Sequence, residues 1–142
     1  ISERKNFTYN VDELGWNYYM NELSAAIGLV QLKKLDKMNK NRKKIAKQYF
    51  EKLEIDEKMP YDSECSYHLY WIMVKNRRKF MKNMQESGIE TGIHYRPIHT
   101  MKLYQNNQKL PITENAGNHI VSIPIHPNLN SLDVERIIKR IN

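Results

Sequence analysis

Residues 15–32 read GWNYYMNELSAAIGLVQL, and the interpretation of the whole chain depends on this stretch. Asn21 is a suitable N-cap for a helix, and Glu22 would place a negative charge at the positive end of the helix dipole. The 3.6-residue period of apolar positions then continues without a proline to about Leu53. The pattern therefore predicts one long helix that begins near residue 21.

The two halves of this predicted helix differ in composition. Every residue from Ala25 to Val30 is apolar or glycine, whereas from Lys33 onward only one stripe is apolar. A helix that is apolar on all sides is covered on more than one side. We therefore expect the first half to lie inside a larger structure or at a subunit contact.

The net charge of +7 is concentrated on the second half of the helix. The spacing of its lysines places five of them on one stripe: Lys33, Lys37, Lys40, Lys44 and Lys47. Such a stripe is typical of the solvated face of an amphipathic helix, and an anionic partner is the alternative. Nucleic acid is not favoured, because no aromatic platform or zinc-finger spacing accompanies the lysines.

Length and cysteine content suggest the class of protein. A chain of 142 residues is long enough for one domain with a core, and Cys65 as the only cysteine excludes an internal disulfide. This composition predicts a protein of the reducing cytoplasm, with neither a membrane span nor a secretory signal. Because the chain starts at Ile1 without a methionine, we expect it to be a piece of something longer.

The remaining pattern predicts a mixed α/β or α+β layer fold. We expect an extended loop over residues 1–20 and a polar surface connection over residues 54–66. The predicted strands are residues 67–74, 89–95 and 121–125, and the predicted helices are residues 77–88 and 130–142. This order predicts a small sheet of about three strands covered by helices.

Two helix ends carry specific signals. Gly88 is a stop signal for the helix over residues 77–88. The last helix should be capped by Asn130 or Ser131. Four of its residues are expected to face the core: Leu132, Ile137, Ile138 and Ile141.

The segment HYRPIH, residues 94–99, is the main candidate for chemistry. His94 and His99 flank Tyr95 and Arg96 just after a predicted strand, on a loop that contains a proline. The two imidazoles can converge on one ligand, or both can be packing residues. No Cys, Asp or Glu lies nearby in the sequence to complete a metal site.

The other candidates are weaker. We interpret His68, His119 and His126 as structural, and Cys65 lies in a polar segment without an obvious base. The sequence contains no GxSxG, P-loop or GxGxxG motif and indicates no catalytic triad.

Four segments together resemble one enzyme family. Residues 15–32 match the pattern G-x-N-Y-x-M-x-x-x-x-A-A-I-G-x-x-Q-L of the DegT/DnrJ/EryC1/StrS sugar aminotransferases. The resemblance continues through SYHLYWIMV, through GIETGIHYRPIH followed by Tyr104, and through SIPIHPNL. It covers nearly the whole chain in the family's order.

The resemblance implies the C-terminal part of a fold type I enzyme dependent on pyridoxal 5'-phosphate (PLP). Members of that family are dimers that move an amino group, typically from glutamate, to a keto sugar linked to a nucleotide. Their products are precursors for polysaccharide, lipopolysaccharide or glycosylation. The Schiff-base lysine belongs to a large N-terminal domain that would lie upstream, so residues 21–142 correspond to the small C-terminal domain. We expect this chain alone to be inactive and to hold no catalytic residue.

The resemblance also implies roles for five residues. Asn17 matches an asparagine that reaches the cofactor phosphate of the neighbouring subunit, and Tyr19 stands where many members have a phosphate-binding arginine. His94, Tyr95 and His99 match a loop that borders the sugar-nucleotide pocket, where Arg96 could face the diphosphate.

Two alternative functions stay open at this point. One is a PLP-dependent sugar dehydratase of the same fold, which carries histidine in place of the Schiff-base lysine. The other is a non-catalytic module that binds an anionic partner through the lysine stripe.

Overall fold

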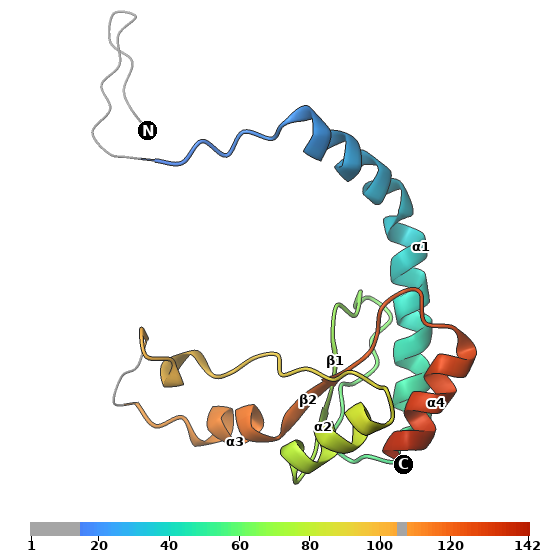
Figure 1. Ribbon diagram of the computed structural model, residues 1–142, viewed down its shortest axis with the longest axis vertical. Coiled ribbons are helices and arrows are strands. Elements are labelled where there is room, and N and C mark those ends of the chain that lie inside the picture. The colour runs from blue at the N-terminus through green and yellow to red at the C-terminus, as the bar shows by residue number, and fades with distance from the viewer. Residues whose placement is uncertain (1–14, 105–107) are drawn as a thin grey trace, which may run out of the picture. The chain divides into compact units, whose positions relative to one another are not determined.

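The computed structural model describes residues 15–104 and 108–142 and confirms the mixed α/β class. Within these residues four α-helices, one 3₁₀ helix and two strands follow one another along the chain (Figure 1). They are α1 (Glu22–Lys52), β1 (Tyr70–Met73), α2 (Arg77–Glu86), η1 (Ile98–Thr100), α3 (Pro111–His119), β2 (Ile120–Ile123) and α4 (Ser131–Ile141).

The long first helix is confirmed. Residues 22–52 form α1. The backbone N–H of Ser24, in the first turn, donates to Asn21 Oδ1 at 2.8 Å. Residues 15–20 have no regular secondary structure, and the rest of the predicted N-terminal loop lies outside the described residues. The chain forms two compact units, and the boundary between them falls within α1, after Lys34.

The first half of α1 is exposed in this chain. Leu23, Ile27 and Val30, spaced so that they share one face of the helix, keep 72%, 55% and 49% of their surface accessible. In the second half all five stripe lysines are exposed, while Ile45 and Tyr49 are buried. The solvated-face interpretation of the lysines agrees with this pattern. Among the described residues, no helix is long and apolar enough to cross a membrane.

The sheet is smaller than predicted. β1 and β2 pair antiparallel, with Tyr70 opposite Ile123 and Met73 opposite Ile120, and they make the two-stranded sheet found in the described residues. The strand predicted over residues 89–95 is wrong: this segment runs beside β2 but forms only one bridge, between Gly92 and Ser122. A second single bridge lies on the far side of β1, where Lys58 pairs with Ile72.

β1 also begins later than residue 67. Tyr67 has a φ of 52°, in the left-handed region that a ladder strand does not use. Its ring is nonetheless fully buried, and its hydroxyl donates to the carbonyl of Asp62 at 3.1 Å. The run 67–74 therefore begins with irregular backbone, in which Tyr67 is buried and His68 exposed, and becomes a strand only at Tyr70.

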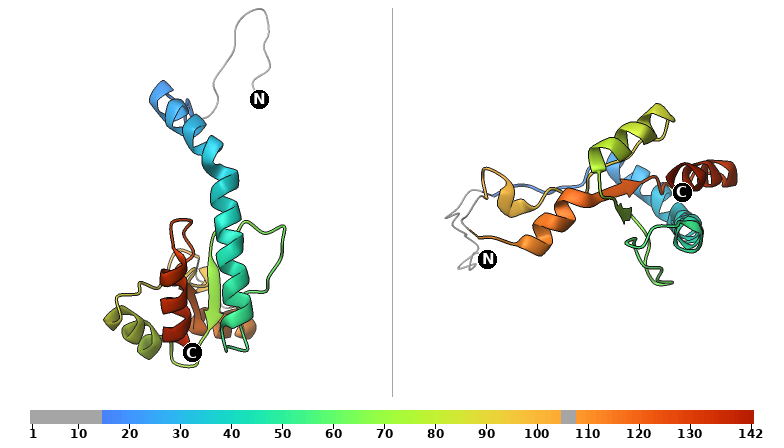
Figure 2. Two further views of the ribbon diagram at one scale, coloured as in Figure 1. Left: turned by 90° about the vertical axis from the view of Figure 1, so that its right-hand side faces the viewer. Right: turned by 90° about the horizontal axis from the view of Figure 1, so that it is seen from below.

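The core lies between the second half of α1, the sheet and α4 (Figure 2). Tyr49 of α1 packs on Tyr70 of β1 with ring centroids 5.2 Å apart. Their hydroxyls donate to the carbonyls of Pro124 and Met59 at 2.7 and 3.0 Å. Burial raises the pKa of both hydroxyls, and the bonds satisfy polar atoms that would otherwise be costly to bury.

The helix ends explain where the chain turns. Gly88 has a φ of +68° and donates to Gln85 O at 2.8 Å, while Ile89 donates to Met84 O at 2.9 Å. These two bonds form a Schellman motif, so the predicted glycine stop of α2 is confirmed. α3 was not predicted from the sequence; its Pro111 occupies the first turn, where the missing N–H costs nothing.

α4 begins with a capping box. Asn130 Oδ1 accepts from Asp133 N and Asp133 Oδ2 accepts from Asn130 N, both at 3.0 Å, so Asn130 is the cap. The expected core position of Leu132 is wrong, because 75% of its surface is exposed, and Val134 is buried in its place. Asn142 joins the ends of α4 and α1, since its side chain bonds Lys52 O and Glu54 N at 3.0 Å.

Candidate functional site

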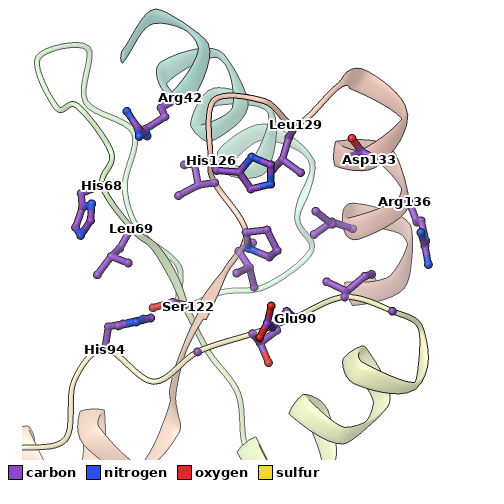
Figure 3. Close-up of a pocket in the computed structure, with 18 residues that line it drawn as sticks. Arg42, His68, Leu69, Glu90, His94, Ser122, His126, Leu129, Asp133 and Arg136 are labelled. Carbon is purple, nitrogen blue, oxygen red and sulfur yellow. The ribbon is translucent and has the colours of Figure 1, made fainter. Parts of the chain in front are cut away.

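A cavity of about 760 Å³ opens within the unit Leu35–Asn142, between α1, the segment 88–94, the end of β2 and α4 (Figure 3). Its apolar wall comes from residues such as Leu69, Ile123 and Ile137. Its polar lining comprises Arg42, His68, Glu90, Thr91, His94, Ser122, His126, Asp133 and Arg136. A cavity with an apolar wall and a few polar groups is typical of a small-molecule site.

His94 reaches this cavity because Gly92 has no side chain. Gly92 and Ser122 exchange two backbone hydrogen bonds, of 3.0 and 2.8 Å, which fix the segment 88–94 beside β2. A Cβ placed on Gly92 would lie 2.5 Å from Cε1 of His94. The imidazole therefore occupies the space above Gly92 that any other side chain would fill.

Two buried polar atoms at this point have no partner. Nδ1 of His94 and Oγ of Ser122 are closed off from solvent, and neither makes a hydrogen bond among the described residues. A buried donor or acceptor without a partner costs about 1–3 kcal/mol, so such atoms mark places where a ligand or a rearrangement is expected.

Tyr95 stands at the outer side of His94. Its ring meets the imidazole edge-on, with centroids 5.0 Å apart and planes at 84°. The side chain is 68% exposed, so its hydroxyl remains available to a molecule that approaches from outside.

The other two residues of the loop are held by local bonds. Arg96 donates from Nε to Thr100 Oγ1 at 3.0 Å and from Nη2 to Thr100 O at 2.6 Å. His99 is only 11% exposed at its side chain and lies 3.2 Å from Glu114 Oε1 of α3. It does not line the cavity, so His94 and His99 do not converge there.

Glu114 ties the start of α3 to this loop. Its Oε1 also accepts from the backbone N–H of Leu110 at 3.0 Å. The Leu110 bond first, and then the bond from His99, hold the pKa of the Glu114 carboxyl below its ordinary value. The charged carboxylate is therefore the form that the loop stabilises.

Asn17 lies in the other compact unit and is exposed. Its Oδ1 accepts from the backbone N–H of Tyr19 at 3.1 Å, which is a local turn bond. The amide nitrogen makes no bond within the described part of the chain, so it is free to donate to a ligand. Tyr19, two residues after Asn17, is 80% exposed.

Most of the cavity lining was not predicted from the sequence. His68 and His126, interpreted as structural, are exposed at the cavity beside Arg42. Nothing local marks these residues, because His68 precedes β1, His126 follows β2 and Arg42 lies in α1. Arg136 and Asp133 also have structural roles, since Arg136 donates to Ser87 O and Asp133 completes the α4 capping box.

The family assignment comes from the whole chain. Residues 1–142 match the DegT/DnrJ/EryC1/StrS aminotransferase family. The chain belongs to this family. The resemblance noted in the sequence is thereby confirmed.

Solved structures with the same fold include other members of this family. The aminotransferase TlmJ from Streptoalloteichus hindustanus is 27% identical, with a TM-score of 0.83, over 95% of this chain and 39% of that chain. PseC from Helicobacter pylori, an aminotransferase involved in the biosynthesis of pseudoaminic acid, is 28% identical, with a TM-score of 0.81, over 98% and 41%. A DegT/DnrJ/EryC1/StrS aminotransferase from Brucella abortus is 27% identical, with a TM-score of 0.81, over 96% and 39%. The chain thus spans about two fifths of the length of these relatives.

Within the unit Leu35–Asn142, the four residues of the family's loop take two different situations. His94 lines the cavity and Tyr95 flanks it, whereas Arg96 and His99 are bound within their own loop and to α3. Asn17 belongs to the first compact unit. Among the described residues, no group of three or more His, Cys, Asp or Glu side chains could hold a metal ion.

Proposed function

We propose that this chain is the C-terminal part of a PLP-dependent aminotransferase that transfers an amino group from glutamate to a nucleotide-linked keto sugar. The family match over residues 1–142 carries the proposal. The proposed pathway role is the supply of cell-surface polysaccharide or glycan precursors in the cytoplasm. PseC, named for its role in the biosynthesis of pseudoaminic acid, is a related case at 28% identity.

His94 and Tyr95 are the proposed substrate contacts. His94 lines the cavity, and the exposed hydroxyl of Tyr95 can donate to or accept from a sugar hydroxyl. Arg96 and His99 take a different part in this proposal, because both are already bonded within the chain. Their role is to hold the loop so that His94 and Tyr95 keep their places.

The cofactor contact proposed for this chain is Asn17. An exposed amide nitrogen without a partner among the described residues fits a phosphate oxygen, so the residue suits the group that the family implies. PLP, when bound, supplies the electron sink for amino transfer. Asn17 would contribute one neutral hydrogen bond to its phosphate in the neighbouring subunit, without the charged contact that arginine at the position of Tyr19 would add.

A homodimer and a large domain complete the proposed enzyme. Two fifths of the relatives' length is covered here, and the residues that hold the cofactor covalently would lie in the remaining part of a longer polypeptide. The exposed apolar face of α1 supports this arrangement, because such a patch is normally covered by a partner or by another domain. The small domain of residues 21–142 would then close one side of the active site.

The test uses the complete parent polypeptide. After purification, it should show the visible absorbance of bound PLP and should form 2-oxoglutarate from glutamate when offered UDP- and dTDP-linked keto sugars. His94→Ala should raise the KM for the accepted sugar nucleotide about two- to tenfold, the size expected for one lost hydrogen bond. Leu132→Gln, on the exposed side of α4, is the matched control and should leave KM unchanged.

Two results would overturn the proposal. Absence of both the PLP absorbance and 2-oxoglutarate would rule out amino transfer as the activity. If the sugar loses water and no 2-oxoglutarate forms, the enzyme is a dehydratase and not an aminotransferase.

A further inference from the structure

The side chains of Ser122 and His94 are neighbours although they are not opposite one another in the sheet. Gly92 is the residue opposite Ser122, joined to it by two backbone hydrogen bonds. Side chains of such a pair stand on the same face, about 5 Å apart at Cβ. Because the imidazole of His94 fills the place of the absent Gly92 side chain, it lies on the same face as the Ser122 hydroxyl (Figure 3).

Both of these buried polar atoms need a partner. Ser122 is 5% exposed and its Oγ has no hydrogen bond in the described chain, and the same holds for Nδ1 of His94, which is closed off from solvent. Both lie where bulk water does not reach them. The least costly solution is a bond between the two, reached by turning the serine side chain.

We infer that Ser122 is a positioning residue that donates its hydroxyl proton to Nδ1 of His94. The opposite direction, from Nδ1–H to Oγ, would leave the serine proton without an acceptor in a buried place. Donation by Ser122 satisfies both atoms with one bond, because a neutral imidazole has one accepting and one donating nitrogen.

The bond determines what His94 offers to a ligand. With Nδ1 as acceptor, the proton of the neutral ring lies on Nε2, so His94 acts as a hydrogen-bond donor at the cavity. Ser122 would thus select carbonyl, hydroxyl or phosphate oxygens as the partners of His94. This reading rests on the proposed function, since it assumes that His94 binds substrate.

The experiment measures the tautomer of His94 directly in the 142-residue chain. Long-range ¹H–¹⁵N correlation spectra at about pH 8, where ordinary imidazoles are neutral, distinguish protonation at Nδ1 from protonation at Nε2. The chain has five histidines, and replacement of His94 by Gln assigns its signals. We expect His94 in the wild-type chain to be protonated at Nε2 alone.

Variants of Ser122 separate positioning from packing. Ser122→Ala should convert the single tautomer of His94 into a mixture, and Ser122→Thr, which keeps the hydroxyl, should restore it. Ser131→Ala, at an exposed serine of α4, is the matched control and should change nothing at His94. A circular dichroism melt of each variant checks that the chain is folded.

The inference fails if wild-type His94 is protonated at Nδ1, a result that needs no variant. It also fails if a folded Ser122→Ala chain keeps the tautomer of the wild type. The spectra are recorded without substrate or cofactor, so a negative result here would not contradict the proposed aminotransferase activity. Equally, an inactive parent protein would leave the tautomer result intact.

Discussion

The loop 92–99 contains residues of the same chemical type with different roles. His94 packs over a glycine and faces a cavity, while His99, five positions later, is bonded to Glu114 and nearly buried. Gly92 is required because of the close approach of a ring, not because of a left-handed backbone. Each role follows from the residue that meets the side chain across the fold.

Gly92→Ala should displace His94. The added Cβ would lie 2.5 Å from Cε1 of the ring, too close for both to stay, so the imidazole must leave the space beside Ser122. We expect the signals of His94 to shift and the free energy of unfolding to fall by about 1–3 kcal/mol, as is typical of overpacking. Urea unfolding and the histidine NMR spectrum measure the two effects.

Gly28→Ala is the control for this substitution. It lies within α1, and nothing lies within 4 Å of the added Cβ, so helix formation should become more favourable by about 0.5–1 kcal/mol. Unchanged His94 signals in Gly92→Ala would contradict the packing described for the ring.

Glu114→Gln should lower the free energy of unfolding more at neutral pH than in acid. The pKa of Glu114 is lowered in the folded chain, so its charged form adds stability above the unfolded pKa, and this contribution is lost as the pH falls through the folded pKa. The difference between wild type and variant in the free energy of unfolding should therefore be larger at pH 6 than in acid, near the pKa of the folded carboxyl. Urea titrations at both pH values measure it.

The source of this effect can be tested at His99. Because the backbone N–H of Leu110 contributes more than His99, His99→Phe should raise the pKa of Glu114 only part of the way to its ordinary value. A carboxyl ¹³C titration follows that pKa directly. A full return to the ordinary value would show that His99, and not the helix start, holds the carboxylate.

Local signals determine where the helices begin and end. α2 ends in a Schellman motif at Gly88, α3 starts with Pro111, and α4 starts with the reciprocal bonds of Asn130 and Asp133. These signals act within a few residues, which is why the ends of α1, α2 and α4 could be predicted closely. The strands were predicted less well, because pairing depends on partners about 50 residues away.

Asn130→Ala should destabilise the chain by about 1 kcal/mol, the usual cost of losing an N-cap. The side chain of Asn130 accepts from Asp133 N, and α4 buries Val134, Ile137 and Ile138 directly behind this cap. Ser131→Ala is the comparison, since Ser131 is exposed and follows the cap. Equal losses in the two urea titrations would mean that the cap is not Asn130.

At the scale of the whole molecule, buried and exposed apolar surface are unevenly distributed. The unit Leu35–Asn142 has a continuous core that includes Tyr49, Ile72 and Val134. The first half of α1 exposes Leu23, Ile27 and Val30 on one face. A face of this kind is unusual on a monomer and favours association.

Leu23→Gln combined with Ile27→Gln should reduce self-association of the isolated chain. Sedimentation velocity at several concentrations should show oligomers for the wild type and a larger monomer fraction for the double variant, because two adjacent apolar side chains leave the patch. Leu132→Gln removes a leucine that is equally exposed but stands on α4, and it should not change the distribution. A wild-type chain that sediments as a monomer at all concentrations would contradict this prediction.

The sequence by itself determined α1, α2 and α4, the glycine stop of α2, the cap of α4 and the family, because periodicity, capping residues and motif spacing are local properties of the chain. Only the tertiary structure decided that His94 lies at a cavity beside Ser122, that His68 and His126 join it there, and that His99 turns instead to Glu114. Those neighbours are brought together by strand pairing and by the packing of α1 and α4, and such long-range contacts leave no local signal in the order of the residues.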